Sequence, residues 1–204
     1  MTEPGEEFLQ KNYEYFQEWQ HWHDKAVNLR KAALTLYRAS IPELRKFEKA
    51  RRVAEKELRK RSVAPIRYPH PDVFPAFSLY GSALENAFKG VMVSKDKGLI
   101  GVNRLSRKLL EHNLIKLAQG AGVSLSSTEQ YVLQWVIEVL IWKARYSVPT
   151  KTEQALHFFH KLDDVRLGSA RTCIKILDGV FARAKKAMPR RIRRAKYDVL
   201  VLLD

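Results

Sequence analysis

The two residues best suited to chemistry in this sequence are Arg107 and His112, which four residues separate. A histidine titrates near neutral pH, so it can take a proton from the 2′-hydroxyl of RNA. An arginine can stabilise the negative charge that develops on the phosphate. The pair therefore suits acid–base chemistry at a phosphate ester, such as the backbone of RNA, without a metal. The alternative is structural, with His112 at the start of a helix and bonded to a neighbouring turn.

A run of basic residues gives the clearest indication of binding. Residues 183–196 read RAKKAMPRRIRRAK and contain no acid. A solvated helix face usually mixes charges, so the unbalanced run predicts an arm that binds phosphates independently of sequence. A soluble tail and a patch for an acidic protein partner are the alternatives. The basic residues of the run are Arg183, Lys185, Lys186, Arg190, Arg191, Arg193, Arg194 and Lys196.

The rest of the sequence contains no motif that indicates another class of enzyme. His157, His160 and Asp164 fall on one predicted helix face, but no second ligand pair accompanies them, so we expect no metal. The sequence has no Walker loop, dinucleotide-binding glycine turn, nucleophile elbow or His-Glu-x-x-His motif, and we expect no cofactor. The one cysteine, Cys173, cannot form a disulfide within the chain and is predicted to be a small buried residue.

Composition favours a folded protein with a polyanionic partner. The chain has 37 Lys and Arg against 22 Asp and Glu, a net charge of +15, and 46% of its residues are hydrophobic. Such an excess favours RNA, DNA or an anionic membrane surface as partner. The opening stretch has no signal-peptide pattern, and Glu138 and Lys143 interrupt the longest apolar segment. We therefore expect a cytoplasmic protein without a membrane span.

Hydrophobic periodicity predicts helices throughout the chain. Apolar residues return every three or four positions over about 6–40, and Pro42 fits the first turn of a second helix over 42–61. That second helix mixes many charges, which indicates that it stands off the core. Four prolines make 63–76 a linker.

Three later segments are predicted to pack together as helices: 77–93, 104–122 and 126–150. The first has one apolar stripe, and Glu85 and Lys89 are spaced for a helical ion pair. The second ends at a glycine cap, Gly120 or Gly122. The third begins with a capping box and is apolar almost all round, so we expect it to be the centre of the fold. The stripe is Phe77, Tyr80, Leu84, Phe88 and Val91, and the capping box is Ser126 with Glu129.

Short motifs in these segments resemble the HEPN superfamily of helical bundles. They are LYGSALENAFKG, HNLIKLA, a Trp-bearing helix closing in KARYSVP, and WHDKAVNLRKAALTLY upstream. The resemblance covers about residues 15–150 and implies a bundle that commonly forms a homodimer. Ribonucleases of this family carry an arginine and a histidine at a spacing that Arg107 and His112 satisfy, although HNLIKLA is similar to a structural turn of the family. Arg145 matches the family's Arg-Tyr-Pro element, but two residues separate Tyr146 from Pro149 and no histidine follows closely.

We therefore expect an all-α, HEPN-like up-and-down helical bundle. Its parts are a long N-terminal helical pair (1–62), a Pro-rich linker (63–76), a core (77–165) and a basic C-terminal helical extension (166–204). The resemblance implies binding of RNA or a nucleotide, in a stress or defence setting. The alternatives are a toxin-like endoribonuclease using Arg107, His112 and Arg145, and an interaction module for an acidic protein.

Overall fold

The computed structural model describes residues 18–61, 72–101, 104–142 and 167–189. These residues form five α-helices, which confirms the prediction of an all-α chain. Two 3-10 turns, η1 (Lys97–Leu99) and η2 (Arg107–Leu109), flank a hairpin of two-residue strands, β1 (Ile100–Gly101) and β2 (Arg104–Leu105). The helices are α2 (Trp19–Arg61), α3 (Phe74–Lys95), α4 (Leu114–Ala121), α5 (Ser127–Trp142) and α7 (Leu167–Ala187).

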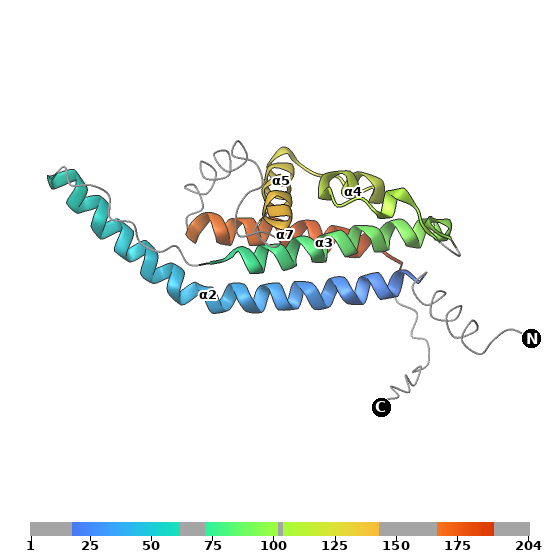
Figure 1. The fold of residues 1–204 in the computed structure, drawn as a ribbon, viewed down its shortest axis with the longest axis horizontal. Helices are drawn as coiled ribbons and strands as arrows, with labels where there is room; N and C mark the ends of the chain where they lie inside the picture. Colours follow the sequence, from blue (N-terminus) through green and yellow to red (C-terminus); the bar gives the residue numbers. More distant parts are fainter. Residues whose placement is uncertain (1–17, 62–71, 102–103, 143–166, 190–204) are drawn as a thin grey trace, which may run out of the picture.

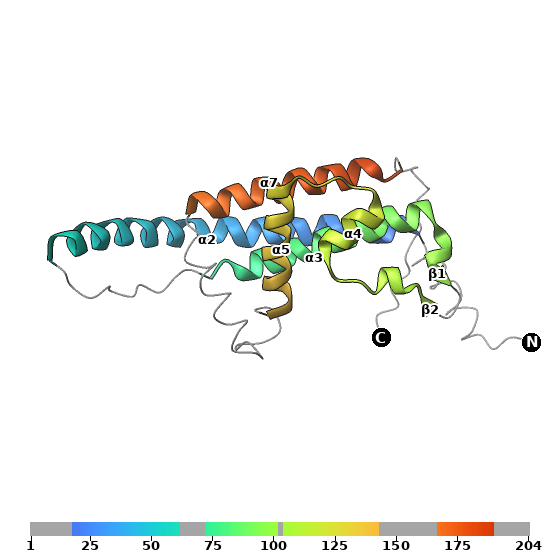
Figure 2. The ribbon, with the colours of Figure 1, turned by 90° about the horizontal axis from the view of Figure 1, so that it is seen from above.

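Helix α3 occupies the centre, where it packs against α2, α4, α5 and α7 (Figures 1 and 2). Every residue of its predicted apolar stripe is fully buried, from Phe77 to Val91. The prediction that the segment from residue 126 forms the centre is wrong, because α5 exposes Gln130, Tyr131 and Gln134. Small residues on the other faces of α3, such as Ala83 and Ala87, let neighbouring helices approach from several sides.

Helix α2 runs beside α3 in the opposite direction, and small residues set their separation. Ala26 and Ala33 are buried on α2, and Gly90 faces it from α3. A Cβ added at Gly90 would lie 3.1 Å from the Trp22 Cβ and 3.3 Å from the Met188 Cε. A larger residue at this position would therefore push α2 away from α3 and displace the Met188 side chain.

The predicted helix break at Pro42 is wrong, because α2 continues through this residue. A proline inside a helix loses one backbone hydrogen bond and crowds the preceding turn, at a cost of about 3 kcal/mol. The cost is offset here because Ile41 and Leu44, on either side, pack into the core. Figure 1 shows α2 bending as it leaves the other helices, as expected of a helix with an internal proline. Its charged C-terminal part then extends past them, as the charge pattern predicted.

Helix α7 is part of the core, although residues 166–204 were predicted to form a basic C-terminal extension. It lies antiparallel to α2, whereas α5 lies across these helices rather than along them (Figure 2). The basic composition of α7 concealed an apolar face with helical spacing. The buried residues of that face are Ala170, Ile174, Leu177, Val180, Phe181 and Ala184, and Met188, directly after the helix, is buried as well.

The predicted caps of α4 and α5 are confirmed. Gly122 ends α4 with φ of 72°, a left-handed conformation that favours glycine, and Lys95 Nζ of α3 donates to the Ala121 carbonyl at 2.7 Å. At the start of α5, Ser126 Oγ accepts from the Glu129 amide at 3.3 Å, and a Glu129 carboxylate oxygen accepts from the Ser126 amide at 2.8 Å. The direction in which the chain enters α5 is therefore fixed at both ends of this turn.

A polar cluster joins α2, α3 and α7. The Asp178 carboxylate of α7 accepts from Arg30 Nε of α2 at 2.8 Å and also from the hydroxyl of Tyr80 in α3. Arg30 Nε also donates to the Tyr80 oxygen at 3.1 Å, and its guanidinium lies 5.4 Å from the centre of the Phe181 ring. Burial and the bond to Asp178 raise the pKa of Tyr80 above its usual value, so the phenol stays protonated. The cluster fixes the register of three helices at one level.

Replacing Tyr80 by phenylalanine tests this cluster. We expect Tyr80→Phe to lower the free energy of unfolding by about 1.5 to 3 kcal/mol, because a hydrogen bond to a charged group is lost in a buried place. Urea denaturation followed by circular dichroism measures the change. Tyr131→Phe makes the same chemical change at a side chain that is 60% exposed, and should be neutral. Equal stability of the two variants would contradict a structural role for the cluster.

Candidate functional site

His112 lies in a tightly bonded turn that precedes α4. Asn113 caps α4, because its side-chain oxygen accepts from the amides of Ile115 and Lys116 at 3.0 and 3.1 Å. Glu111 Oε1 accepts from the amides of His112 and Asn113 at 3.0 and 2.9 Å. The bond to the Asn113 amide is the main reason that the pKa of Glu111 is lowered. The backbone at His112 is therefore held by its own turn.

The His112 ring bonds to α3 rather than to this turn. Its Nδ1 lies 3.1 Å from Glu85 Oε1, and the same oxygen accepts from Lys89 Nζ at 2.6 Å. The ion pair of Glu85 and Lys89 was predicted, but the addition of His112 was not. The Lys89 side chain is 6% exposed and that of His112 is 62% exposed. The buried ammonium of Lys89 thus holds the carboxylate of Glu85, and this carboxylate orients the exposed ring of His112.

The contact between His112 and Glu85 leaves one ring nitrogen of His112 able to accept a proton. With a proton on Nδ1 directed at Glu85, the Nε2 atom of His112 is the nitrogen left to accept a proton. A carboxylate that orients an imidazole in this way recurs at sites of general base catalysis. Glu85 was identifiable in the sequence only as the partner of Lys89, because it lies 27 positions before His112.

The structure does not link Arg107 to His112. Arg107 begins η2 with an exposed side chain, and no hydrogen bond or ion pair joins the two side chains within the described residues. Arg145 lies outside the described residues. The three residues predicted for RNA cleavage are thus not assembled into one site in the part of the chain that the structure describes.

The basic run is described only in its first part. Arg183, Lys185 and Lys186 leave the last turns of α7 with exposed side chains, while Arg190, Arg191, Arg193, Arg194 and Lys196 lie outside the described residues. Arg183 Nη2 forms an ion pair with Glu129 Oε1 of α5 at 2.6 Å. Lys185 and Lys186 form no ion pair within the described part of the chain, so their charge faces solvent. Buried Ala184 and Met188 fix this end of α7 to the core.

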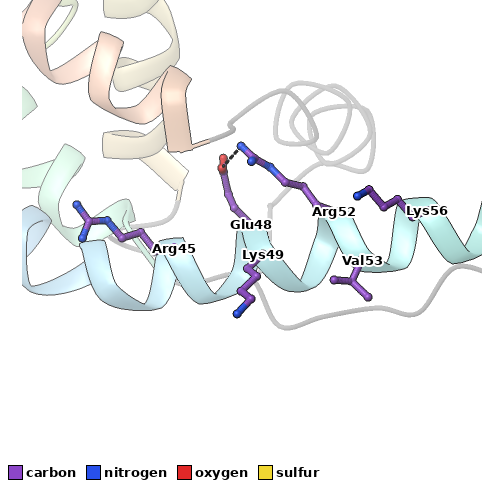
Figure 3. Close-up of a pocket in the computed structure, with 6 residues that line it drawn as sticks. All are labelled: Arg45, Glu48, Lys49, Arg52, Val53 and Lys56. Carbon is purple, nitrogen blue, oxygen red and sulfur yellow. Dashed lines mark ion pairs between the residues drawn. The ribbon is translucent and has the colours of Figure 1, made fainter.

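A second basic surface occurs on the projecting part of α2 (Figure 3). A shallow hollow of about 260 Å³ lies along it, lined by Arg45, Glu48, Lys49, Arg52, Val53 and Lys56. Arg52 Nη2 lies 3.5 Å from Glu48 Oε2, which is the ion pair drawn in Figure 3. The mixed charges of this segment predicted only a solvated helix. The hollow therefore adds basic residues that were not among the predicted site residues.

The described residues hold no obvious metal site and no membrane-spanning helix. No group of three or more potential metal ligands gathers within them, and His157, His160 and Asp164 lie outside them. None of the described helices combines the length and the apolar character needed to cross a bilayer. Cys173 is partly buried on α7, and its burial raises the pKa of the thiol.

Comparison with known proteins gives no assignment for the chain. No protein-family model, curated protein or solved structure matches it.

A pH-dependent contribution to stability is expected from Glu129. Burial alone would raise the pKa of this carboxyl, but bonds from Ser126 and Arg183 outweigh it and hold the pKa below its usual value of 4.5. The stabilisation is therefore complete above that pH and is lost as the pH falls through the lowered value. We expect Glu129→Gln to cost about 1 kcal/mol at neutral pH and to reduce the loss of stability on acidification.

Urea denaturation at several pH values between neutral and acid measures both effects. Glu43→Gln removes an exposed carboxylate from α2 and serves as the control. An acid-induced loss of stability that is the same in Glu129→Gln and in the parent protein would contradict the role given to Glu129.

Proposed function

We propose that this chain is a HEPN-like RNA-binding protein that contacts the phosphate backbone through the basic run 183–196. The supporting observation is that this run, which contains no acid, starts on the exposed side of α7, at a point where α7 is fixed to the core by Met188. A charged segment that begins at a rigid point loses less freedom on binding than one on a free chain. The resemblance to the HEPN superfamily supports RNA over DNA, together with a stress or defence setting.

Salt dependence distinguishes phosphate binding from other uses of a basic run. Neutralising phosphates releases counterions, so the affinity falls steeply with salt. The logarithm of the association constant falls linearly with the logarithm of the salt concentration, with a slope of about 0.7 for each single-strand phosphate contacted. A surface for an acidic protein would instead bind one partner with a milder salt dependence. The two functions therefore differ in a quantity that one titration measures.

The test of this proposal changes four arginines together, Arg190, Arg191, Arg193 and Arg194, to serine. We expect weaker binding of a labelled single-stranded RNA and a salt slope that is smaller by about 3. Fluorescence anisotropy over a series of salt concentrations gives both values. The matched control changes four exposed lysines to serine on α2, η1, η2 and α4: Lys25, Lys97, Lys108 and Lys116. An arm variant whose slope is the same as that of this control would discard the role of the arm.

RNA cleavage is the second candidate function, and the contact between His112 and Glu85 favours it. An exposed imidazole whose Nδ1 is held by a carboxylate is prepared to accept a proton at Nε2. Arg107, on the neighbouring turn η2, or Arg145 would then stabilise the phosphate. No metal is required for this chemistry.

The cleavage function is tested with single-stranded RNA in EDTA. We expect His112→Ala to abolish cleavage and to leave RNA binding intact, because the imidazole acts in the chemical step. Glu85→Gln should lower the cleavage rate without changing the affinity, because it removes the charge that orients the ring. Cleavage that persists in purified His112→Ala would assign the activity to other residues. Binding without cleavage by the parent protein would leave RNA binding as the only function of the two.

A further inference from the structure

Six basic residues of α2 leave the helix on one flank and form a row. Counted at about 100° a residue, they fall within about 60° of arc and extend along about 37 Å of the helix. The structure exposes all six side chains. We call this set the α2 row: Lys31, Arg38, Arg45, Lys49, Arg52 and Lys56.

The row carries almost no compensating negative charge. Arg52 pairs with Glu48, whereas the other five members form no ion pair within the described residues. The other residues within this arc between 27 and 56 are Val27 and Leu34, which pack against the core. Sequence composition conceals the row, because most acids of this helix lie on other flanks. Asp24, seven residues before Lys31, borders the N-terminal end of the row and pairs with His23. Glu43 and Glu55, for example, pair with Lys46 and Arg51.

Two residues of α7 extend the positive surface beside α2. Arg171 and Lys185 are seven residues before and after Asp178, so they leave α7 on the side of Asp178, which reaches Arg30 of α2. Burial raises the pKa of Tyr37, a residue of α2, and the positive charge of Arg171 opposes this rise. Arg171 therefore lies close enough to α2 to act on Tyr37. The one acid of α7 in this neighbourhood, Asp178, is neutralised by Arg30. The surface is therefore positive on both helices.

We propose that the α2 row binds the phosphate backbone of a nucleic-acid double helix, as a contact surface separate from the arm 183–196. The inference rests on the proposed function and names the form of nucleic acid that the protein holds. A long, rigid line of cations matches a stiff, regularly charged duplex. Single strands are usually held by stacking on aromatic side chains, and the described residues place no exposed aromatic residue on this flank.

The same surface suits other partners less well. Protein interfaces are centred on apolar or aromatic anchors. Among the residues that line the hollow, only Val53 is hydrophobic. A membrane-bound amphipathic helix needs a free apolar face, whereas the apolar face of α2 packs on α3. A phosphate backbone needs only charge at regular intervals.

The experiment compares two variants that remove the same charge from the full chain. The row variant changes Arg45, Lys49 and Lys56 to glutamine, and the control changes Lys25, Lys97 and Lys108 to glutamine. All six side chains are exposed and form no ion pair within the described residues, so both variants should fold. Thermal unfolding by circular dichroism checks this. The probes are an RNA duplex of about 20 base pairs, which is longer than the row, and a single strand of the same length.

We expect the row variant to lower the salt slope for the duplex by about 2 to 3 relative to the control, and to change single-strand binding no more than the control does. An equal slope in the two variants, a loss confined to the single strand, or a parent protein that does not bind the duplex would overturn the inference. Binding of the single strand alone would still leave RNA binding through the arm intact. The experiment therefore distinguishes the case in which the α2 row does not bind a duplex from the case in which the protein does not bind RNA.

A second variant covers the case in which the first one unfolds. Lys31→Gln with Arg38→Gln alters the row where α2 runs beside α7, instead of on the projecting part. We expect the duplex slope to fall by about 1.5 to 2, against Lys25→Gln with Lys108→Gln as control. No difference from this control would also overturn the inference.

Discussion

The fold depends on the need to cover α3 on all sides. This helix is apolar around nearly its whole circumference, so water must be excluded from each of its faces. Four other helices supply that cover, and each contributes its own apolar face. Even Lys89 of this helix is buried, which is tolerated because Glu85 lies beside it. The charged residues of α2 and α7 are consequently left on the outer surface.

Directional contacts then select one arrangement among the many that would cover α3. Apolar burial is not directional, so helices could slide along one another at little cost. The bonds among Arg30, Tyr80 and Asp178 have fixed geometry and allow one register only. Arg183 and Glu129 do the same for α7 and α5, nearer the C-terminus of α7. The exposed charges therefore occupy reproducible positions, which a binding surface requires.

Local patterns in the sequence predicted local features well. The stripe of α3, the bond between Glu85 and Lys89, the capping box at Ser126 and the glycine cap at Gly122 each depend on residues within a few positions of one another. Such features follow from helix geometry alone.

Features that depend on distant residues could not be predicted. Whether Pro42 interrupts α2 is decided by the packing of Ile41 and Leu44, and local rules favour a break. The contact of His112 with Glu85 joins α3 to the turn before α4, so no spacing rule reveals it. The α2 row is present in the sequence as a seven-residue repeat, from Lys31 to Arg52, but acids and apolar residues separate its members, so no unbroken run of charge marks it.

The pairing of α2 with α7 has a consequence for the synthesis of the chain. Arg30 and Asp178 are 148 residues apart, and α7 is the last described helix to cover α3. During translation, α2 and α3 can pair early, but one side of α3 stays uncovered until the residues of α7 have left the ribosome. Contacts of such long range also slow folding, because a large loop must close before they form. The nascent chain therefore carries an exposed apolar surface from the synthesis of α3 until that of α7, and a surface of this kind is what chaperones bind.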